Sequence, residues 1–328
     1  MPATFAHCLM AQEAIDKISA YVKLPENSKF IPYVQKLGEK NNFAMTGAAG
    51  PDYPYTTDLL TTVVVPISHT WANRMHYEST LAFVEEGTKA LLKTDKATES
   101  LAIRLAWFCG FVSHVVADSY VHPVINSVVG GPYIFTHQEH GTCELIEDIY
   151  IFKQLTKEDI VDANARSGAL GYLRILEECS DPDDDDRIHP EIASFWKQLL
   201  QVTHPHAQQY FSDIDPDRWH YNYKSTVNFT VDPGAIFRHA VNLTGRAYKK
   251  KSDITAQETE KYLAKVKLPD GNVSDYDSVF LNAVGLVVDA WLRLFQDIEE
   301  GKWQALARLV KDWNLDTGVD ESHVDLWP

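Results

Sequence analysis

The sequence has few cysteines and no periodic pattern. Its 328 residues include only four cysteines, at irregular spacing: Cys8, Cys109, Cys143 and Cys179. Such a set does not predict a disulfide framework, so we expect all four thiols to be reduced and packed inside the protein. The 16 glycines and 15 prolines follow no fixed period. Their distribution excludes collagen-like and repeat architectures and leaves a globular chain.

Positive charge is also scarce. The chain carries 30 Lys and Arg against 46 Asp and Glu, a formal net charge of −16. Because proteins hold nucleic-acid phosphates and anionic lipid surfaces mainly with Lys and Arg, we expect no stable nucleic-acid complex and no attraction to an anionic membrane. A small substrate held mainly by bound metal is not excluded by this charge.

Targeting signals and long uninterrupted apolar runs are missing from the sequence. The first 18 residues contain no basic stretch followed by an apolar core, so they do not resemble a signal peptide. The longest apolar run, 101–117, is interrupted by Arg104 and His114, which argues against a membrane span. We therefore predict no transmembrane segment and a cytoplasmic location. The sequence does not indicate the oligomeric state.

Several catalytic signatures are absent as well. There is no Gly-x-Ser-x-Gly nucleophile elbow and no P-loop, and no His is followed directly by Asp. The first two absences count against serine hydrolases of that type and against P-loop nucleotide hydrolases. The third counts against the HD-type metal phosphohydrolases, which are the main all-α alternative.

Helical patterns dominate what is present, and the short stretch Thr61–Pro66 is the only strand-like one. We therefore predict an all-α fold. We treat 1–328 as a single domain with a metal core at about 1–155 and a helical extension at about 156–328, although the acidic loop 180–186 is a possible division. The predicted helices lie near 4–22, 29–40, 76–94, 98–127, 137–154, 157–179, 189–212, 234–249, 254–265, 274–299 and 301–313.

One helical segment combines an apolar run with three side chains that bind metals. Residues 101–117 are almost wholly apolar, which is typical of a helix buried on all sides. His114, within this run, and then Asp118 and His122 are spaced four residues apart, so they share one helix face, turning by about 40° per step. Burying these groups without partners would cost on the order of several kcal/mol each. A divalent metal ion is the simplest explanation, because zinc binds neutral imidazole nitrogen and ionised carboxylate oxygen.

Further candidates lie on both sides of this helix. His140 and Glu144 form a second pair at helical spacing, which supplies two ligands at a fixed separation. His7 lies on the apolar side of the first predicted helix, where a lone histidine is more often a hydrogen-bonded core residue. Asp52 lies in a Gly-Pro-Asp-Tyr turn, and aspartate also suits such turns for conformational reasons alone.

The ordered combination of these residues resembles the zinc-dependent phospholipase C family, which shares its fold with single-strand-specific nucleases. The resemblance runs from His7 to about Asp148 and includes a His-x-x-x-Asp-x-x-x-His-Pro helix followed by a His-x-x-x-Glu pair. The interval from Asp118 to His122 is most similar to that of intracellular bacterial members. The resemblance implies a multi-helix bundle around a buried cluster of two or three zinc ions, with phosphoester hydrolysis as the usual chemistry.

The resemblance also implies how the ligands are shared. One zinc ion would be held by Asp52, His114, Asp118 and a histidine from the 69–76 segment. We favour His76 over His69 because His76 begins a predicted helix directed at the site. A second ion would be held by His122, His140 and Glu144. Asp118 would bridge to a third ion near His7, which secreted members complete with an N-terminal tryptophan that this chain, beginning Met-Pro, does not have.

These residues lead us to predict a zinc-dependent hydrolase of a small-molecule or lipid-derived phosphoester. Zinc makes water acidic enough to attack at neutral pH and neutralises charge on phosphorus, and Asp52 would orient or deprotonate that water. The alternatives are a single-strand nuclease-like phosphodiesterase and a metal-binding scaffold with other chemistry.

Two further groups of side chains are predicted to support this site. Candidates for carboxylates that fix the imidazole rings are Glu78, Glu147 and Asp148. Candidates for contact with the organic part of the substrate are Tyr53, Tyr55 and Trp71.

Overall fold

The computed structural model describes residues 4–55, 71–162, 172–231, 248–320 and 326–327. Most of these residues are helical, which confirms the predicted all-α class. The strand-like stretch Thr61–Pro66 and His69 lie outside the described residues, as does most of the helix expected near 234–249.

The elements follow one another along the chain as a series of helices with two short hairpins. The helices before the first hairpin are α1 (Thr4–Tyr21), η1 (Pro25–Phe30), α2 (Ile31–Glu39), α3 (Asn41–Ala48), η2 (Gly50–Asp52), α5 (Trp71–Tyr77), α6 (Thr80–Leu92), α7 (Glu99–Val129), α8 (Tyr133–Thr156) and α9 (Tyr172–Glu178). The first hairpin is β1 (Ser180–Asp181) and β2 (Asp184–Ile188). It is followed by α10 (Pro190–Thr203), η4 (Pro205–Asp213), α11 (Pro216–Val231), η5 (Lys251–Asp253), α13 (Ala256–Glu258) and η6 (Thr259–Ala264). The chain continues with β3 (Val266–Lys267), β4 (Val273–Ser274), α14 (Tyr276–Glu300) and α15 (Gln304–Ala307).

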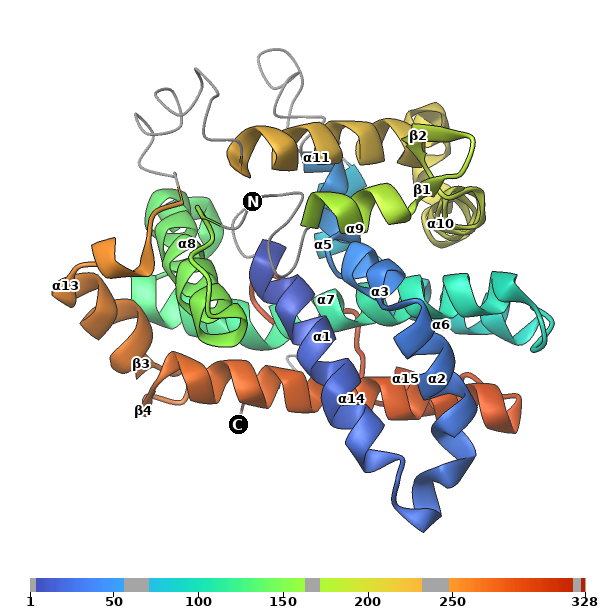
Figure 1. Cartoon of the computed structure of the whole chain (residues 1–328), viewed down its shortest axis with the longest axis horizontal. Coiled ribbons are helices and arrows are strands. Elements are labelled where there is room, and N and C mark those ends of the chain that lie inside the picture. The colour runs from blue at the N-terminus through green and yellow to red at the C-terminus, as the bar shows by residue number, and fades with distance from the viewer. Residues whose placement is uncertain (1–3, 56–70, 163–171, 232–247, 321–325, 328) are drawn as a thin grey trace.

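Helix α7 is the longest described helix and runs across the middle of the molecule (Figure 1). It begins after Thr98, whose side chain accepts a hydrogen bond from the backbone amide of Leu101. It ends at Gly130, whose φ of +92° lies in the left-handed region that commonly stops a helix. Because most of its side chains are buried, α7 carries its metal-type residues into the protein core.

Helices α3 and α7 cross at very short distance. A methyl group on Gly47 would lie 2.0 Å from the Trp107 carbonyl oxygen, and one on Gly110 would lie 1.9 Å from the Ala44 carbonyl oxygen. Only glycine allows two helix backbones to approach this closely. The crossing brings the end of α3, and the turn η2 after it, against the middle of α7.

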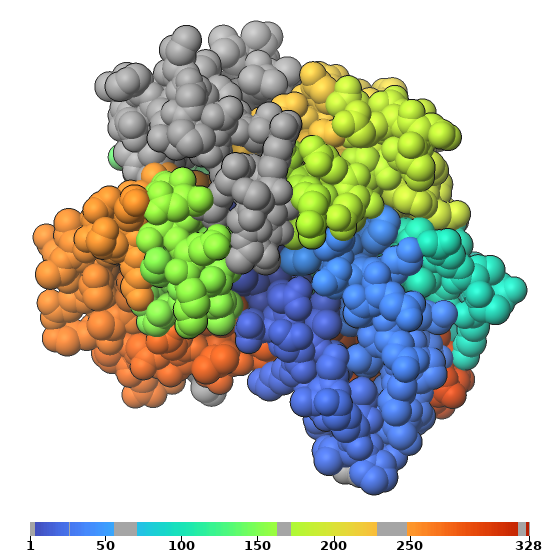
Figure 2. All heavy atoms as spheres, in the orientation of Figure 1, coloured from blue at the N-terminus to red at the C-terminus, as the bar shows by residue number. Residues whose placement is uncertain are grey.

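Helix α14 supports α7 along its length, and α1 crosses both of them (Figure 1). The Trp291 indole of α14 donates a 2.7 Å hydrogen bond to the Cys109 carbonyl oxygen of α7. The space-filling view shows the first helices, in blue, directly beside α14, in orange-red (Figure 2). One hydrophobic cluster therefore contains side chains from both ends of the chain. The division into a metal core at 1–155 and a helical extension at 156–328 stays a prediction.

All four cysteines are buried and free, which confirms the expectation of reduced, packed thiols. Burial raises the pKa of Cys8 to about 12 and that of Cys109 well above its ordinary value. These thiols are therefore protonated at neutral pH.

The structure differs from the prediction around the acidic loop. The segment 180–188 forms a hairpin because Asp181 and Asp184 each accept a hydrogen bond from a backbone amide two residues later, which fixes the turn. The helix expected near 254–265 is a short α-helical turn, capped by Thr255, that continues as a π-helix. Neither detail changes the fold class.

Two described helices, α7 and α14, are long and apolar enough to cross a membrane by length and composition. Of their most apolar windows, 89% and 56% lie buried inside the protein. Core helices show the same burial, and the predicted absence of a transmembrane segment stays a prediction.

Candidate metal centre

The candidate metal centre is built on three successive turns of α7. His114, Asp118 and His122 lie on one face of this helix, as their spacing predicts. The surrounding elements bring five further side chains to that face, namely His7 from α1, Asp52 from η2, His76 from α5, and His140 and Glu144 from α8. All eight predicted site residues therefore lie in one cluster.

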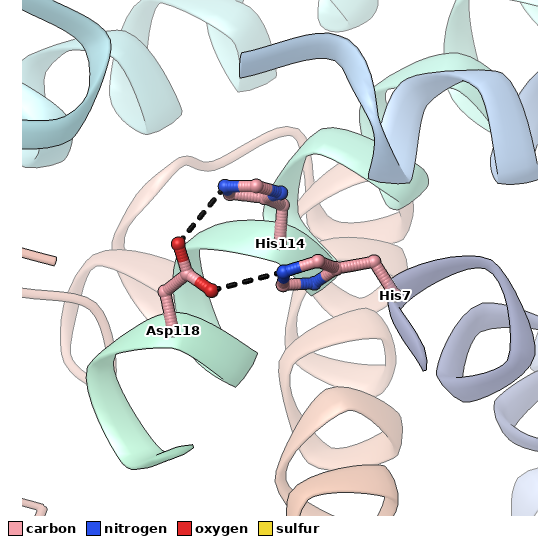
Figure 3. Close-up of side chains that lie close together, drawn as sticks. All are labelled: His7, His114 and Asp118. Carbon is pink, nitrogen blue, oxygen red and sulfur yellow. Dashed lines mark ion pairs between the residues drawn. The ribbon is translucent and has the colours of Figure 1, made fainter. Parts of the chain in front are cut away.

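Asp118 is the centre of the first part of the cluster. Its Oδ1 lies 3.0 Å from His7 Nε2, and its Oδ2 lies 3.0 Å from His114 Nε2 (Figure 3). The two imidazole rings stack, with centroids 4.2 Å apart and planes inclined by 20°. Asp118 is 2% exposed, so this carboxylate is removed from water, and imidazoles lie beside both of its oxygens.

Asp52 and His76 extend this first part toward α5. His76 Nε2 lies 3.4 Å from Asp52 Oδ1 and 3.8 Å from Asp118 Oδ2. It also lies 3.2 Å from His114 Nε2. The ligand atoms of Asp52, His76 and His114 are close enough to one another to hold one ion, as are those of His7, His114 and Asp118. We call these five residues the Asp118 end.

His122, His140 and Glu144 form the second part, which we call the Glu144 end. Glu144 Oε1 lies 3.4 Å from the Nε2 atom of each histidine. His122 Nε2 also lies 3.6 Å from Asp118 Oδ1, so the two ends are continuous. A ninth side chain, Asp316, offers a carboxylate oxygen within 4.8 Å of ligand atoms of His122 and His140.

The hydrogen bonds of the Nδ1 atoms determine which nitrogen of each imidazole carries the proton. Three Nδ1 atoms lie 2.8 to 3.0 Å from backbone carbonyl oxygens: His76 at Ala72, His114 at Ala48 and His122 at Leu315. A carbonyl oxygen only accepts, so each Nδ1 carries the proton. In neutral rings the Nε2 lone pairs then point at carboxylate oxygens and, between His76 and His114, at each other. This arrangement requires a positive charge among them, either a proton or a metal ion.

The electrostatics of the cluster support this conclusion. Burial disfavours the charged form of His114, but the carboxylates of Asp118 and Asp52 raise its pKa to about 9. Burial likewise opposes protonation of His122, yet Asp118 and Glu144 raise its pKa to about 10. Despite burial, the histidines hold the pKa of Asp118 well below its ordinary value. The carboxylates therefore favour a positive charge at this site, carried either by the imidazoles or by a bound metal ion.

Buried polar atoms without partners provide a test of whether these residues fit zinc. Glu144 Oε2 is buried and accepts no hydrogen bond from the described residues, and neither His7 Nδ1 nor His140 Nδ1 has a partner among them. A buried carboxylate oxygen without a donor is costly unless a cation lies beside it. The mixture of imidazole nitrogens and carboxylate oxygens is a zinc donor set, so the residues fit the metal.

The three carboxylates predicted to fix imidazole rings have other contacts. Glu78 pairs with Arg74 and His206, and buried Glu147 accepts from the Cys143 thiol. Asp148 accepts hydrogen bonds from the Ala6 backbone amide at 2.7 Å and from the Tyr248 hydroxyl at 2.8 Å. This part of the prediction is wrong, because these contacts are not with imidazoles of the site, and backbone carbonyls orient three of the five rings, those of His76, His114 and His122. Asp148 instead holds the backbone amide of Ala6, the residue before His7.

Of the three aromatic residues predicted to contact the substrate, two lie in the core and one lies at the site. Tyr53 is fully buried and stacks on Tyr223 at 4.1 Å, and Trp71 is buried with its indole donating to the Tyr210 carbonyl oxygen. Both belong to the core rather than to a substrate surface. Tyr55 remains at the site, with its ring centroid 5.3 Å from that of His76.

Comparison with known proteins gives one finding. A family model described as zinc dependent phospholipase C matches residues 6–205, which is more than half of the chain. No curated protein and no solved structure matches the chain. The matched segment contains all eight predicted site residues but not Asp316, which no spacing pattern in the sequence connects to the others.

Proposed function

The chain belongs to the zinc-dependent phospholipase C family, and from this premise we propose that it is a zinc-dependent phosphoester hydrolase acting on a small-molecule or lipid-derived substrate. The observation that carries the proposal is the set of Nε2 lone pairs that converge on buried carboxylates. Such a set fits zinc and has no evident structural use without a cation.

The ligands would be divided between the two ends of the cluster. At the Asp118 end, one ion would be held by Asp52, His76, His114 and Asp118, with His7 and Asp118 available to a further ion. At the Glu144 end, a second ion would be held by His122, His140 and Glu144. When bound, zinc supplies Lewis-acid stabilisation of charge on the phosphoryl oxygens and acidifies water.

Asp52 would orient the water that attacks phosphorus. Burial opposes its ionisation, but His114 and His76 lower the pKa of this carboxyl, so it is a carboxylate at neutral pH. A carboxylate only accepts hydrogen bonds, and it fixes a water molecule by taking one of its hydrogens. Asp52 contacts His76 through Oδ1, which lies 3.4 Å from the ring Nε2.

An apolar rim beside the Glu144 end supports a substrate with a lipid-derived part. The side chains of Ile134 and Phe135 are 75% and 81% exposed at the start of α8. Next to them, the Tyr133 ring lies edge-on to His140 with centroids 5.1 Å apart. We expect Ile134→Ser/Phe135→Ser to raise KM for a long-chain phosphodiester more than for a short-chain one. Val273→Ser, which alters an exposed apolar residue elsewhere, is the matched control.

The proposal is tested by measuring zinc content and hydrolysis on the same purified protein. We expect about two or three zinc ions per chain and turnover of a chromogenic phosphocholine diester without cleavage of single-stranded DNA. His114→Ala/His140→Ala should lose both properties. His137→Ala, an exposed histidine on the same helix as His140, should keep them.

Other outcomes would select other functions. DNA cleavage without turnover of the diester would favour the nuclease-like alternative, which the net charge of −16 disfavours. Zinc-loaded protein without either activity would favour a metal-binding scaffold. Protein that binds no metal would refute the hydrolase. A cytoplasmic location remains part of the proposal and is checked by cell fractionation.

A further inference from the structure

The segment Trp313–Val319, which we call the C-terminal strap, contacts both ends of the metal centre. The Leu315 backbone amide donates to the His76 carbonyl oxygen at 2.9 Å. The Leu315 carbonyl oxygen accepts from His122 Nδ1 at 3.0 Å. One residue of the strap thus links α5, which carries a histidine of the Asp118 end, to α7 beside the Glu144 end. The strap lies outside the segment matched by the family model.

The strap is fixed in place by a tight turn. Asn314 and Val319 form an isolated antiparallel bridge, and the side chain of Asn314 accepts from the Asp316 backbone amide at 3.0 Å. Gly318 has a φ of +65°, and a methyl group there would lie 2.3 Å from the Ser119 carbonyl oxygen. The strap is therefore in direct contact with the α7 backbone between Asp118 and His122.

This turn brings the Asp316 carboxylate to the Glu144 end. One of its oxygens lies within 4.8 Å of ligand nitrogens of both His122 and His140. Its hydrogen-bond donor from the described part of the chain is the Tyr133 backbone amide, which lies 3.4 and 3.3 Å from the two oxygens. These long contacts occupy the carboxylate only weakly. Asp316 therefore faces two histidines, and the Tyr133 amide is only a distant donor to it.

We infer that Asp316 is a fourth ligand of the metal position formed by His122, His140 and Glu144. This inference rests on the proposed zinc-dependent function and adds a residue that the family match does not contain. Two imidazoles and two carboxylates complete a four-ligand set and balance the charge of a divalent ion. The strap then has two roles at this end, since Leu315 orients the ring of His122 and Asp316 binds the ion beside it.

A purely structural role for Asp316 makes a different prediction. As a cap for the first turn of α8, the side chain needs only an oxygen that accepts from the Tyr133 amide. Asn supplies that oxygen but lacks the negative charge. Asp316→Asn thus keeps the cap and weakens the metal ligand. Asp312→Asn is the matched control, because Asp312 precedes the strap and caps α6 through the Leu81 amide.

The experiment compares zinc content and the rate of zinc release to a chromogenic chelator for the full-length wild type, Asp316→Asn and Asp312→Asn. We expect Asp316→Asn to lose one zinc per chain or to release it at least ~10-fold faster, while Asp312→Asn behaves as wild type. Equal zinc content and equal release for Asp316→Asn and wild type would overturn the inference. A wild type that binds no zinc at this position would overturn it too.

Two additional measurements keep the result interpretable. Circular dichroism of the metal-free proteins shows whether Asp316→Asn folds; if it does not, Gly318→Ala replaces it, because the added methyl displaces the strap while Asp316 is retained. Gly318→Ala should show the same selective zinc loss, and full retention would overturn the inference. Zinc release does not depend on hydrolysis, so a zinc-loaded wild type without phosphoesterase activity refutes the proposed function alone.

Discussion

The two ends of the metal centre are assembled in different ways. At the Asp118 end, His76 and His114 are buried, and both are oriented by carbonyls that lie within the first half of the chain. At the Glu144 end, His122 is 14% exposed and is oriented by Leu315, while His140 Nδ1 and Glu144 Oε2 have no partner among the described residues. Two histidines of the first end are thus oriented from within the first half of the chain, although His7 Nδ1 there also has no partner among the described residues, whereas His122 depends on the distant C-terminal strap. We expect the first end to bind metal more tightly.

Asp118→Asn should have the largest effect, because the Asp118 carboxylate contacts histidines of both ends. We expect zinc affinity to fall by more than ~100-fold at the Asp118 end. The metal-free protein should lose about 3–5 kcal/mol of unfolding free energy, since the buried imidazoles lose their counter-charge. Elemental analysis and urea denaturation measure the two effects. Asp289→Asn, at a surface ion pair, is the control and should change neither.

His140→Ala should separate the two ends. Its Nε2 contacts Glu144, so the variant should lose one zinc ion and keep those bound around Asp118. Stepwise titration with a chelator would show one missing step for this variant. Loss of all zinc from His140→Ala would contradict the comparison, because it would mean that the ends bind metal as a single unit.

Asp148→Ala should have a smaller effect, confined to the Asp118 end. Without Asp148 the Ala6 amide loses its acceptor next to His7, which should cost about 1–3 kcal/mol of stability. We expect zinc affinity to fall by roughly 10-fold through misplacement of His7. The check is a double-mutant cycle with His7→Ala, in which Asp148→Ala should add little further loss of zinc. Fully additive losses would show that Asp148 does not act through His7.

His220→Asn should leave zinc binding unchanged and alter only acid stability. Burial lowers the pKa of His220 to about 3, and its ring is hydrogen-bonded to Ser180. The unfolded chain takes up this proton below about pH 6.5 while the folded protein does not, so its contribution to stability is lost as the pH falls from about 6.5 toward 3. Between pH 7 and pH 5, the metal-free wild type should lose roughly 2 kcal/mol more than the variant. Parallel pH curves for the two proteins would refute this assignment.

The features that were predicted correctly are those that follow from helical periodicity along one segment of the chain. The fold class and the common face of His114, Asp118 and His122 follow from helical periodicity, because a helix fixes which side chains share a face. The resemblance to a family supplied the partners from other elements, and the structure places His76 beside Asp52 and His114. The expectation that His76 begins a helix is wrong, because it lies near the end of α5 and the next helix begins at Thr80. His69, the alternative, lies outside the described residues.

What the sequence did not predict depends on contacts between distant segments. Asp316 reaches the site only because the strap folds back on α7, and no spacing to His122 or His140 marks it in advance. The roles of backbone carbonyls at Ala48, Ala72 and Leu315 are invisible in a sequence, since every residue carries the same group. The prediction that Asp148 fixes an imidazole ring fails because its oxygens accept from the Ala6 amide and the Tyr248 hydroxyl.

Helix α7 also sets the distances between its three candidate ligands. With a rise of about 1.5 Å per residue, four residues set each step at ~6 Å, and the whole interval from His114 to His122 spans ~12 Å. One inserted residue between them would rotate every later position by about 100° and turn His122 away from Glu144. In this chain, an insertion or deletion between His114 and His122 should therefore separate His122 from Glu144, whereas a substitution that keeps the length of the helix should not.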